Sequence, residues 1–387
     1  MEFVKEPTSI FNKIRNTIYL KKLLKNSKPL NKILFILMLP PPYGGGEIVS
    51  QYLYEEIKGI DGFGFYIVRR KNHNKTKQGR LNLSNFIYGF FLIFSLAKII
   101  AVQRPNAIYL GISKTIFPFI RDSLIVLFSN LLGIRVYAEF HGMNFLFLNN
   151  RIFRIYFYFV INKISKLRVL SSSIKDYVIK AGYHNKVYVV DNGISISVGE
   201  PKKMNNDEIR ILYLGVIDTM KGFSDVIEVL NRLSCNNRIR LKLNVVGEWR
   251  NESYKNECMN LINKYGLNQK IKFYGLLINQ QKLNIIKSSD IHLHLTKWDG
   301  QPLSIIECMS QGVPSISTKV GAIPEMIENN VNGFLVDDVL DETVQLIEKI
   351  VVDSIQYHLI SKNCIEHFKK RFTAEVMARK IIKMVDE

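Results

Sequence analysis

The strongest chemical pattern in the sequence is a pair of acidic residues around the start of a predicted helix. Asp299 lies in the turn after a predicted strand, and Glu307 lies eight residues later, inside the helix. Gly300 is in the turn, and the backbone N–H groups of Leu303 and Ser304 open the helix, where free N–H groups suit a diphosphate. Glu307 could accept hydrogen bonds from a ribose. Taken alone, an ordinary capped helix start explains the segment about equally well.

Two glycine-containing loops follow predicted strands elsewhere in the chain. Gly44 and Gly45 come after the apolar run 33–39, and glycines there let the backbone approach an anion at the start of the next helix. The second loop begins at Gly215 and reaches Lys221, which is positioned to meet a phosphate by a charge-assisted bond. A solvated loop lysine is the simpler explanation of Lys221 alone. The GxGxxG spacing is absent, which disfavours a dinucleotide-dependent enzyme.

The predicted elements that must position these residues alternate between strands and helices. Short apolar runs predict buried parallel strands, and helical stretches such as 222–233 separate them. The predicted strands are 33–39, 64–68, 107–110, 136–140 and 166–170 in the first half, and 211–214, 241–246, 271–274, 291–295 and 315–317 in the second. Such alternation gives parallel sheets with right-handed crossovers. We therefore expect an α/β fold of two Rossmann-like, doubly wound parallel-sheet domains facing a cleft.

A polar stretch at 199–207 marks the predicted boundary between the domains. A chain of 387 residues is long enough for two domains, each with its own core. We place a basic extension at residues 1–30, an N-terminal domain at 31–198 and a C-terminal domain at 199–365. Residues 366–387 are predicted to form a C-terminal helix that packs back on the N-terminal domain.

Positive charge is concentrated in the first half of the chain. Residues 1–200 contain 28 basic and 11 acidic side chains, whereas residues 201–387 contain 25 and 23. A compositional bias would raise the basic content of both halves alike, so the first half is predicted to face an anion: nucleic acid, acidic lipid or a phosphorylated substrate.

The four cysteines form no close pair in the sequence. This argues against a disulfide framework and a zinc knuckle, and it indicates a reducing compartment.

Two segments of the first half are candidates for contact with a membrane. The run 86–102 is marginal for a membrane span, and a buried or interface-lying helix is favoured. The run 145–164 mixes aromatic and basic residues, which suits either a lipid headgroup zone or a core helix whose basic side chains reach solvent. The basic run from Arg69 to Arg80 is explained as a solvated loop or, less simply, as a contact to an acidic acceptor or lipid headgroups. No signal peptide is evident.

A series of ordered motifs makes residues 33–387 resemble a retaining glycosyltransferase of family 4, the glycosyl transferases group 1, with the GT-B architecture. The motifs are Gly44-Gly45 with Glu47, Arg104-Pro105-Asn106, Glu139-Phe140-His141-Gly142, Leu170-Ser171, Asn192-Gly193-Ile194, Lys221-Gly222, Val246-Gly247-Glu248, Phe273-Tyr274-Gly275 and the segment from Asp299 to Glu307. No single motif is specific, but their order and spacing together are. The resemblance implies that the C-terminal domain binds a nucleotide-sugar and the N-terminal domain an acceptor.

The resemblance also implies roles for individual residues. Glu307 would hold the ribose, Asp299 would contact sugar hydroxyls, and the amides of Leu303 and Ser304 would hold the diphosphate. Lys221 would neutralise the leaving phosphate, and Gly45 would let the N-terminal loop close over it. His141 matches an active-site histidine near the donor sugar. The implied catalytic residues are His141, Asp299 and Lys221, and the implied nucleotide-sugar site comprises Gly44, Gly45, Gly215, Lys221, Gly247, Gly300, Leu303, Ser304 and Glu307.

Two positions depart from the family pattern. The first acid is usually Glu and is Asp299 here, which withdraws the carboxylate by one methylene. The position after Gly215 usually carries Arg and is Val216 here, so one phosphate-binding cation is missing; we favour replacement by another cation or a difference of branch. No metal or other cofactor is expected. No Asp-x-Asp occurs, and His292 and His294 have no third ligand nearby in the sequence, so packing or site polarity explains them.

These inferences predict a retaining glycosyltransferase that moves a sugar from a UDP- or GDP-sugar to a saccharide acceptor, which could be lipid-linked, in surface polysaccharide biosynthesis. The alternative is a non-catalytic, glycosyltransferase-like subunit that binds a membrane or a partner. The predicted partners include an anionic membrane surface but no nucleic acid, because no nucleic-acid-binding motif is present. The expected location is cytoplasmic, peripheral on the inner face of the cytoplasmic membrane.

Overall fold

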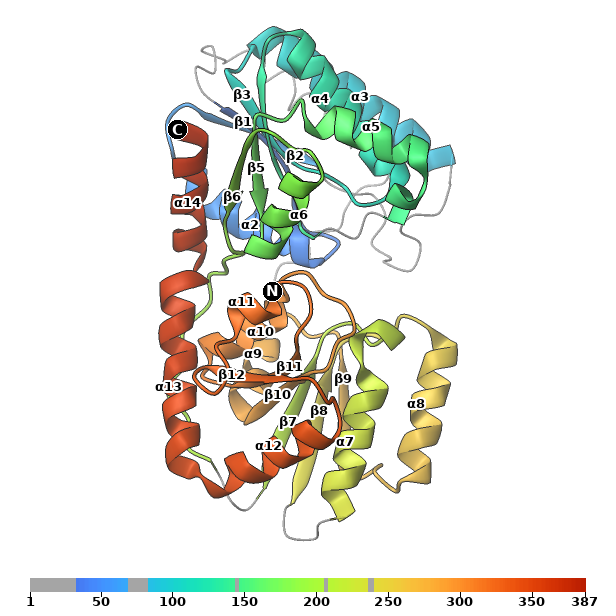
Figure 1. Cartoon of the computed structure of the whole chain (residues 1–387), viewed down its shortest axis with the longest axis vertical. Helices are drawn as coiled ribbons and strands as arrows, with labels where there is room; N and C mark the ends of the chain where they lie inside the picture. The colour runs from blue at the N-terminus through green and yellow to red at the C-terminus, as the bar shows by residue number, and fades with distance from the viewer. Residues whose placement is uncertain (1–32, 69–82, 143–145, 205–207, 236–239) are drawn as a thin grey trace, which may run out of the picture.

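The computed structural model describes residues 33–68, 83–142, 146–204, 208–235 and 240–387, and for residues 83–90, 146 and 147 it describes the backbone alone. The predicted basic extension 1–30 and the basic run from Arg69 to Arg80 lie outside the described residues. Within them the chain forms two α/β domains, each built on one parallel sheet (Figure 1). The α/β fold of two doubly wound domains is therefore confirmed.

The N-terminal domain is a six-stranded parallel sheet with helices on both faces (Figure 1). Its strands are β1 (Ile33–Met38), β2 (Phe63–Val68), β3 (Ala107–Gly111), β4 (Arg135–Glu139), β5 (Lys166–Val169) and β6 (Lys186–Val189). The spatial order is β2-β1-β3-β4-β5-β6, so the winding reverses between β1 and β3. The prediction missed β6, an edge strand of only four residues.

The central strand β1 shows why the sequence pattern predicted a buried strand. Ile33, Phe35 and Leu37 face one core, which α2 (Gly45–Ile57) covers. Leu34 and Ile36 face a second core, because side chains alternate along a strand. The helices on that second face are α3 (Leu83–Gln103), α4 (Ile116–Leu131) and α5 (Arg151–Ile161), and α6 (Ser172–Lys180) connects β5 to β6. Burial on both faces requires an unbroken apolar run.

The C-terminal domain repeats this plan with a different strand order. Its strands are β7 (Ile209–Leu214), β8 (Leu241–Val246), β9 (Ile271–Gly275), β10 (Ile291–His294), β11 (Ser315–Thr318) and β12 (Gly333–Val336). The order β9-β8-β7-β10-β11-β12 is that of the Rossmann sheet, with the reversal between β7 and β10. The prediction missed β12, a four-residue strand at the other edge.

Helices flank this second sheet and extend to the end of the chain. They are η3 (Thr219–Lys221), α7 (Phe223–Cys235), α8 (Glu252–Lys264), α9 (Asn279–Ser288), α10 (Leu303–Ser310), α11 (Ile323–Met326), α12 (Asp341–Val352), α13 (Ser354–Arg371) and α14 (Ala374–Asp386). α13 packs beside α10 of the C-terminal domain, whereas α14 packs on the N-terminal domain beside α2 (Figure 1). The last helices thus bind both domains.

The chain passes between the domains twice, and the two passages touch. The amide N–H of Ile194 donates to the carbonyl of Phe372 at 2.9 Å, and the amide of Ala374 donates to the carbonyl of Ile194 at 3.0 Å. A Cβ on Gly193 would lie 2.3 Å from the carbonyl oxygen of Thr373, so only glycine fits. We call residues 193–194 and 372–374 the double crossing.

The two apolar segments considered for a membrane are helices of the N-terminal domain. The run 86–102 lies in α3, which buries Leu92, Leu96 and Ile99 on the sheet. Most of the run 145–164 lies in α5, which buries Phe157 and Val160. Among the described helices, none has the length and hydrophobicity needed to cross a membrane.

Candidate functional site

The candidate site lies where loops from the carboxyl ends of both sheets meet. Gly45, after β1, faces α10: a Cβ on Gly45 would lie 3.9 Å from Cδ1 of Leu303. His141, after β4, faces the loop after β10: a Cβ on Gly300 would lie 3.2 Å from the His141 carbonyl oxygen. Doubly wound sheets bind ligands at these ends, where the winding reverses.

Asp299 is the centre of a compact charged cluster. Lys221 Nζ lies 2.5 Å from Asp299 Oδ2, and His294 Nε2 lies 3.1 Å from the same oxygen. The other carboxylate oxygen accepts the Gly300 amide at 2.8 Å. Burial would raise the pKa of Asp299, but the hydrogen bond from His294 and the charge of Lys221 hold it well below its usual range. Two predicted catalytic residues, Asp299 and Lys221, are therefore in direct contact.

The loop that carries Lys221 is held by the side chain of Asp218. Asp218 Oδ1 accepts the Met220 amide at 2.9 Å and the Lys221 amide at 3.0 Å. Gly222 ends this turn with φ +66°, and a Cβ there would lie 1.8 Å from the Leu295 carbonyl oxygen. Only glycine adopts this conformation in that space. The close approach to the strand before Asp299 brings the ammonium to the carboxylate.

The predicted glycines after β7 and β8 lie against each other. A Cβ on Gly247 would lie 1.8 Å from the carbonyl oxygen of Gly215, and φ is +151° at Gly247. The Gly215 amide donates to the carbonyl of Val246 at 3.0 Å. The two glycines let the loops after β7 and β8 approach at backbone distance. Gly44 has a different place, directly before α2, where its carbonyl accepts the Ile48 amide at 3.0 Å.

Glu307 lies within α10 and is almost buried. Its Oε1 pairs with Lys282 Nζ of α9 at 2.6 Å. A carboxylate can accept several hydrogen bonds, so this ion pair leaves capacity for hydroxyl donors. The charge of Glu307 also acts on Tyr52, which belongs to α2 of the other domain. The pKa of Tyr52 is raised first by burial and second by this charge. Sequence reasoning missed Lys282, since a single lysine in a polar helix carries no signal.

The start of α10 has the predicted form. Pro302 precedes Leu303 and provides no side-chain cap. Ser304 Oγ lies 3.5 Å from His294 Nδ1, which ties the helix start to the histidine beside Asp299. The early N–H groups of such a helix suit an anion.

His141 is held by a buried network that sequence reasoning missed. Its Nε2 lies 3.0 Å from Glu139 Oε1, and Glu139 also pairs with the fully buried Arg168 and accepts a 2.7 Å hydrogen bond from Tyr109. Burial would raise the pKa of Glu139, but the charges of His141 and Arg168 hold it well below its usual range. Glu139 and Arg168 are register partners on β4 and β5. The network fixes the histidine relative to the sheet.

Residue Gln301 links the Asp299 loop to the N-terminal domain. Its Nε2 donates to Asp191 Oδ1 at 2.8 Å, and its Oε1 accepts the Asn192 amide at 2.6 Å. Asp191 also pairs with Arg371, at the end of α13, at 2.9 Å. These contacts join residues more than a hundred positions apart, so no sequence pattern predicts them.

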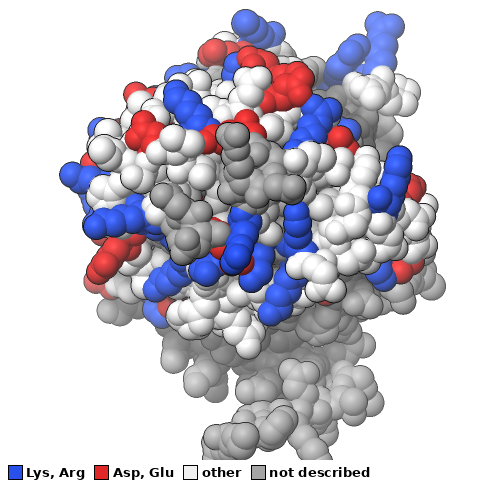
Figure 2. All heavy atoms as spheres, turned by 90° about the horizontal axis from the view of Figure 1, so that it is seen from below, with Lys and Arg blue, Asp and Glu red and all other residues white. Residues whose placement is uncertain are grey.

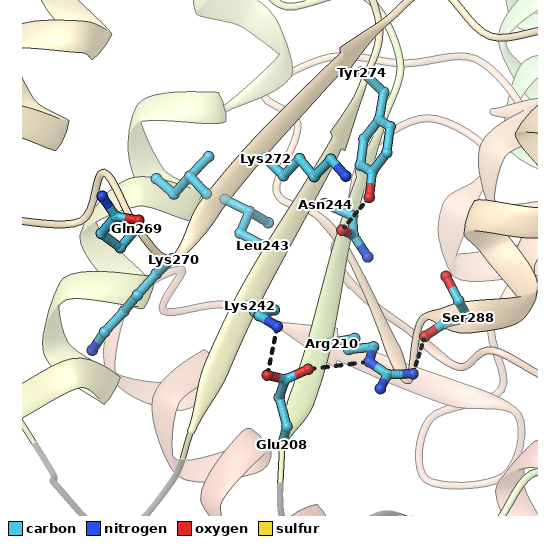
Figure 3. Close-up of a pocket in the computed structure, with 11 residues that line it drawn as sticks. Glu208, Arg210, Lys242, Leu243, Asn244, Gln269, Lys270, Lys272, Tyr274 and Ser288 are labelled. Carbon is cyan, nitrogen blue, oxygen red and sulfur yellow. Dashed lines mark hydrogen bonds and ion pairs between the residues drawn. The ribbon is translucent and has the colours of Figure 1, made fainter.

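A separate cavity lies at the opposite edge of the second sheet and contains none of the predicted site residues. It has a volume of about 360 Å³ and lies around the first residues of β7, β8 and β9 (Figure 3). Its basic side chains are Arg210, Lys242, Lys270 and Lys272. Glu208 pairs with Lys242 at 2.9 Å and Arg210 at 3.3 Å. We call it the basic groove. Figure 2, a view of this end, shows Lys and Arg side chains over much of the face.

The two strand histidines have separate environments. His292 is fully buried, and its Nδ1 bonds Ser315 Oγ at 2.9 Å; burial, together with the charge of His294, lowers its pKa well below the usual value. His294 belongs to the Asp299 cluster. Within the described ranges, no three metal-binding side chains lie close enough together to hold an ion.

The C-terminal domain is similar to a known family. Residues 199–367 match the family "Glycosyl transferases group 1". The match covers 169 residues, less than half of the chain, and it spans the sheet of the C-terminal domain. The predicted group is therefore confirmed for this part of the chain, while assignment to family 4 and retention of configuration stay predictions.

Similar proteins include two bacterial galactosyltransferases. A lipopolysaccharide 1,6-galactosyltransferase of Salmonella typhimurium is 26% identical over 211 residues, 51% of this chain and 56% of the relative. A UDP-Gal:alpha-D-GlcNAc-diphosphoundecaprenol alpha-1,3-galactosyltransferase of Escherichia coli is 30% identical over 82 residues, 21% of each protein. The chain spans about half the length, or less, of curated relatives that it matches.

Solved structures resemble the group 1 domain together with the N-terminal domain. HepE of Anabaena in complex with UDP is 16% identical with a TM-score of 0.70, covering 92% of this chain and 99% of that one. A glycosyltransferase of Rickettsia africae is 19% identical with a TM-score of 0.72, covering 92% and 98%. At these identities the likeness shows the fold, and it agrees with the expected GT-B architecture.

Proposed function

We propose that the protein is a retaining glycosyltransferase that moves a sugar from a UDP- or GDP-sugar to a lipid-linked saccharide acceptor in surface polysaccharide biosynthesis. The observation that carries the proposal is the cluster of Lys221, Asp299 and His294 beside the start of α10, in a group 1 domain. The galactosyltransferases named above support a nucleotide-sugar donor and a polysaccharide pathway, and the UDP complex of HepE supports a uridine nucleotide.

The charges of the cluster suit departure of a nucleoside diphosphate. As the bond from the anomeric carbon to the phosphate oxygen breaks, the leaving group gains negative charge, and fixed donors aimed at that charge are the main catalytic lever. Lys221 and the amides of Leu303 and Ser304 are those donors. The acceptor oxygen bonds to the anomeric carbon on the same face, and its proton passes to the leaving phosphate oxygen. We propose no protein nucleophile, metal or other cofactor for this step.

The remaining roles follow from position. Asp299 would accept hydrogen bonds from sugar hydroxyls through the carboxylate that Lys221 and His294 keep ionised. His141 would face the donor sugar from the N-terminal domain, held by Glu139. Glu307 would accept the ribose hydroxyls beside its ion pair with Lys282. Gly44 and Gly45 at the start of α2, and the paired Gly215 and Gly247, would let backbone approach the nucleotide-sugar.

Donor binding is the first test. Thermal-shift and hydrolysis assays with UDP-, GDP- and ADP-sugars should show stabilisation by one nucleotide class. Glu307→Ala should weaken binding about 10- to 100-fold, because hydrogen bonds to a charged group contribute about 1.5–3 kcal/mol. Glu307→Gln, which keeps the shape, should be intermediate. If the wild type responds to no donor, the non-catalytic alternative is favoured, since Val216 already removes a cation that the family usually has.

We also propose that the N-terminal domain binds an anionic membrane surface at the inner face of the cytoplasmic membrane. On α5, Ile152, Ile155 and Phe159 are 77%, 61% and 53% exposed, and Arg151 and Arg154 of the same helix are exposed as well. Neighbouring helices add further exposed apolar side chains, namely Phe91 and Phe94 of α3 and Phe117 and Leu124 of α4. Apolar and basic groups on one surface helix suit the headgroup zone of acidic lipids.

Vesicle binding tests this surface. The chain should cosediment with phosphatidylglycerol vesicles more than with phosphatidylcholine vesicles, and Ile155→Asp should weaken binding about tenfold, since one buried aliphatic side chain contributes about 1.5–3 kcal/mol. Val352→Asp is the matched control, because Val352 is 86% exposed on α12 of the other domain. Equal vesicle binding by the two variants would contradict the assignment of the membrane-binding surface to α5.

A further inference from the structure

Lys114 lies at the candidate site, although no motif of the sequence drew attention to it. It follows β3 at the carboxyl edge of the first sheet, beside the point where the winding reverses between β1 and β3. The loop is held in place: the Ser113 amide donates to Oδ2 of the buried Asp122 at 2.9 Å, and Thr115 is the N-cap residue of α4. Ligands of doubly wound sheets bind at such edges.

The side chain of Lys114 reaches the C-terminal domain. Its Nζ lies 5.3 Å from the centre of the Trp298 ring. A Cβ on Gly142 would lie 3.0 Å from Lys114 Nζ and 4.0 Å from Cα of Gly300. Trp298 and Gly300 are the neighbours of Asp299 in the chain. An ammonium over an aromatic ring is attracted by its face, so Trp298 helps to hold the charge there.

The positive charge of Lys114 is left without an ion-pair partner by the residues that the structure describes. Asp299 is already bound to Lys221 at 2.5 Å, and in the described part of the chain no carboxylate forms an ion pair with Lys114. Two ammonium groups therefore lie near Asp299, and only that of Lys221 is paired with its carboxylate. Burial lowers the pKa of Lys114; the charge of Asp299 opposes this shift and that of Lys221 adds to it. An anion bound between the two lysines would balance the excess positive charge.

We propose that Lys114 binds a phosphate oxygen of the nucleoside diphosphate together with Lys221, and so supplies the cation that is missing at Val216. The inference rests on the proposed function, because it assigns one more residue to the same donor site. It gives the N-terminal domain a direct part in holding the leaving group. It also explains how the site keeps two cations around the diphosphate although one family position is apolar.

Calorimetric titration of the full chain with nucleotides tests the proposal. Lys114→Gln should weaken binding of UDP or GDP, whichever the wild type prefers, about 10- to 100-fold. Binding of the matching nucleoside monophosphate should change less than about threefold, because the distal phosphate is absent. Lys114→Arg should keep most of the affinity. Adding Val216→Arg to Lys114→Gln should raise the affinity for the diphosphate about tenfold, because the new guanidinium supplies a cation from the C-terminal domain.

The outcomes separate this inference from the proposed function. Lys272→Gln removes the same charge from the basic groove and should bind like the wild type (Figure 3). Equal diphosphate affinity of wild type and Lys114→Gln would overturn the inference alone. So would an equal loss of affinity for diphosphate and monophosphate, or a double variant that binds the diphosphate no better than the single one. Failure of the wild type to bind any nucleotide would overturn the proposed function as well.

Discussion

Replacing Lys221 with Met should lower turnover of the donor sugar about 10²–10³-fold, the usual effect of removing one fixed donor from a developing negative charge. Lys221 is placed for this role by the turn at Asp218 and by Gly222, and its ammonium lies 2.5 Å from Asp299. Met keeps the length and packing of the side chain but removes its charge. The measurement is kcat for transfer to an acceptor, or for donor hydrolysis where no acceptor is known.

Three variants distinguish charge from structure in this experiment. Lys221→Arg should retain far more activity than Lys221→Met, because it keeps a cation. Lys272→Gln in the basic groove should be fully active. Melting temperatures of the Met and Arg variants should agree within a few degrees, since Lys221 is partly exposed. A kcat for Lys221→Met within about threefold of the wild type would contradict the proposed role.

Replacing Arg168 with Met should destabilise the N-terminal domain by about 3–5 kcal/mol, because it removes the fully buried cation that pairs with the buried carboxylate of Glu139. Arg168 is fully buried and donates to the carbonyls of Val190 and Asp191 at 3.1 and 3.0 Å, besides pairing with Glu139. The measurement is denaturant unfolding, with the free energy extrapolated to water.

A double variant tests whether the loss comes from the unpaired charge. Glu139→Gln combined with Arg168→Met should be less destabilised than Arg168→Met alone, because no carboxylate is then left buried without its cation. The pKa of Glu139 is lowered in the folded protein. Its ionisation therefore adds to the free energy of unfolding above the ordinary pKa of a glutamate, and this contribution is lost progressively as the pH falls from there through the folded-state pKa. Equal stability of single and double variants would contradict the charge explanation.

The sequence predicted the parts of the fold that local pattern determines. Burial on both faces makes β1 a continuous apolar run, and the same reasoning located ten of the strands. β6 and β12 were missed because four residues at an edge give too little pattern. The turn at Asp299 and the helix containing Glu307 were also predicted, since a turn and a helix start are local features.

The partners of the site residues could not be predicted in this way. The pair of Glu139 and Arg168 depends on the register of β4 and β5, which requires the strand order. The bonds of Gln301 to Asp191 and Asn192 depend on how two domains meet. Lys114 reaches Trp298 for the same reason. Contacts of this kind arise from tertiary structure and leave no periodic trace in the chain.

The double crossing has a consequence for how substrates enter. Two chain passages that touch side by side, at Gly193 and Thr373, would have to take up any rotation of one domain against the other, and their contact would leave that rotation a single axis. Asp191 and Asn192, which hold Gln301, directly precede this axis, so a swing about it would change their separation from Gln301 very little. The glycine loop would move away from α10 while the Asp299 loop stayed attached at Gln301. A nucleotide-sugar could then enter and leave without the charged cluster having to be reassembled at each turnover.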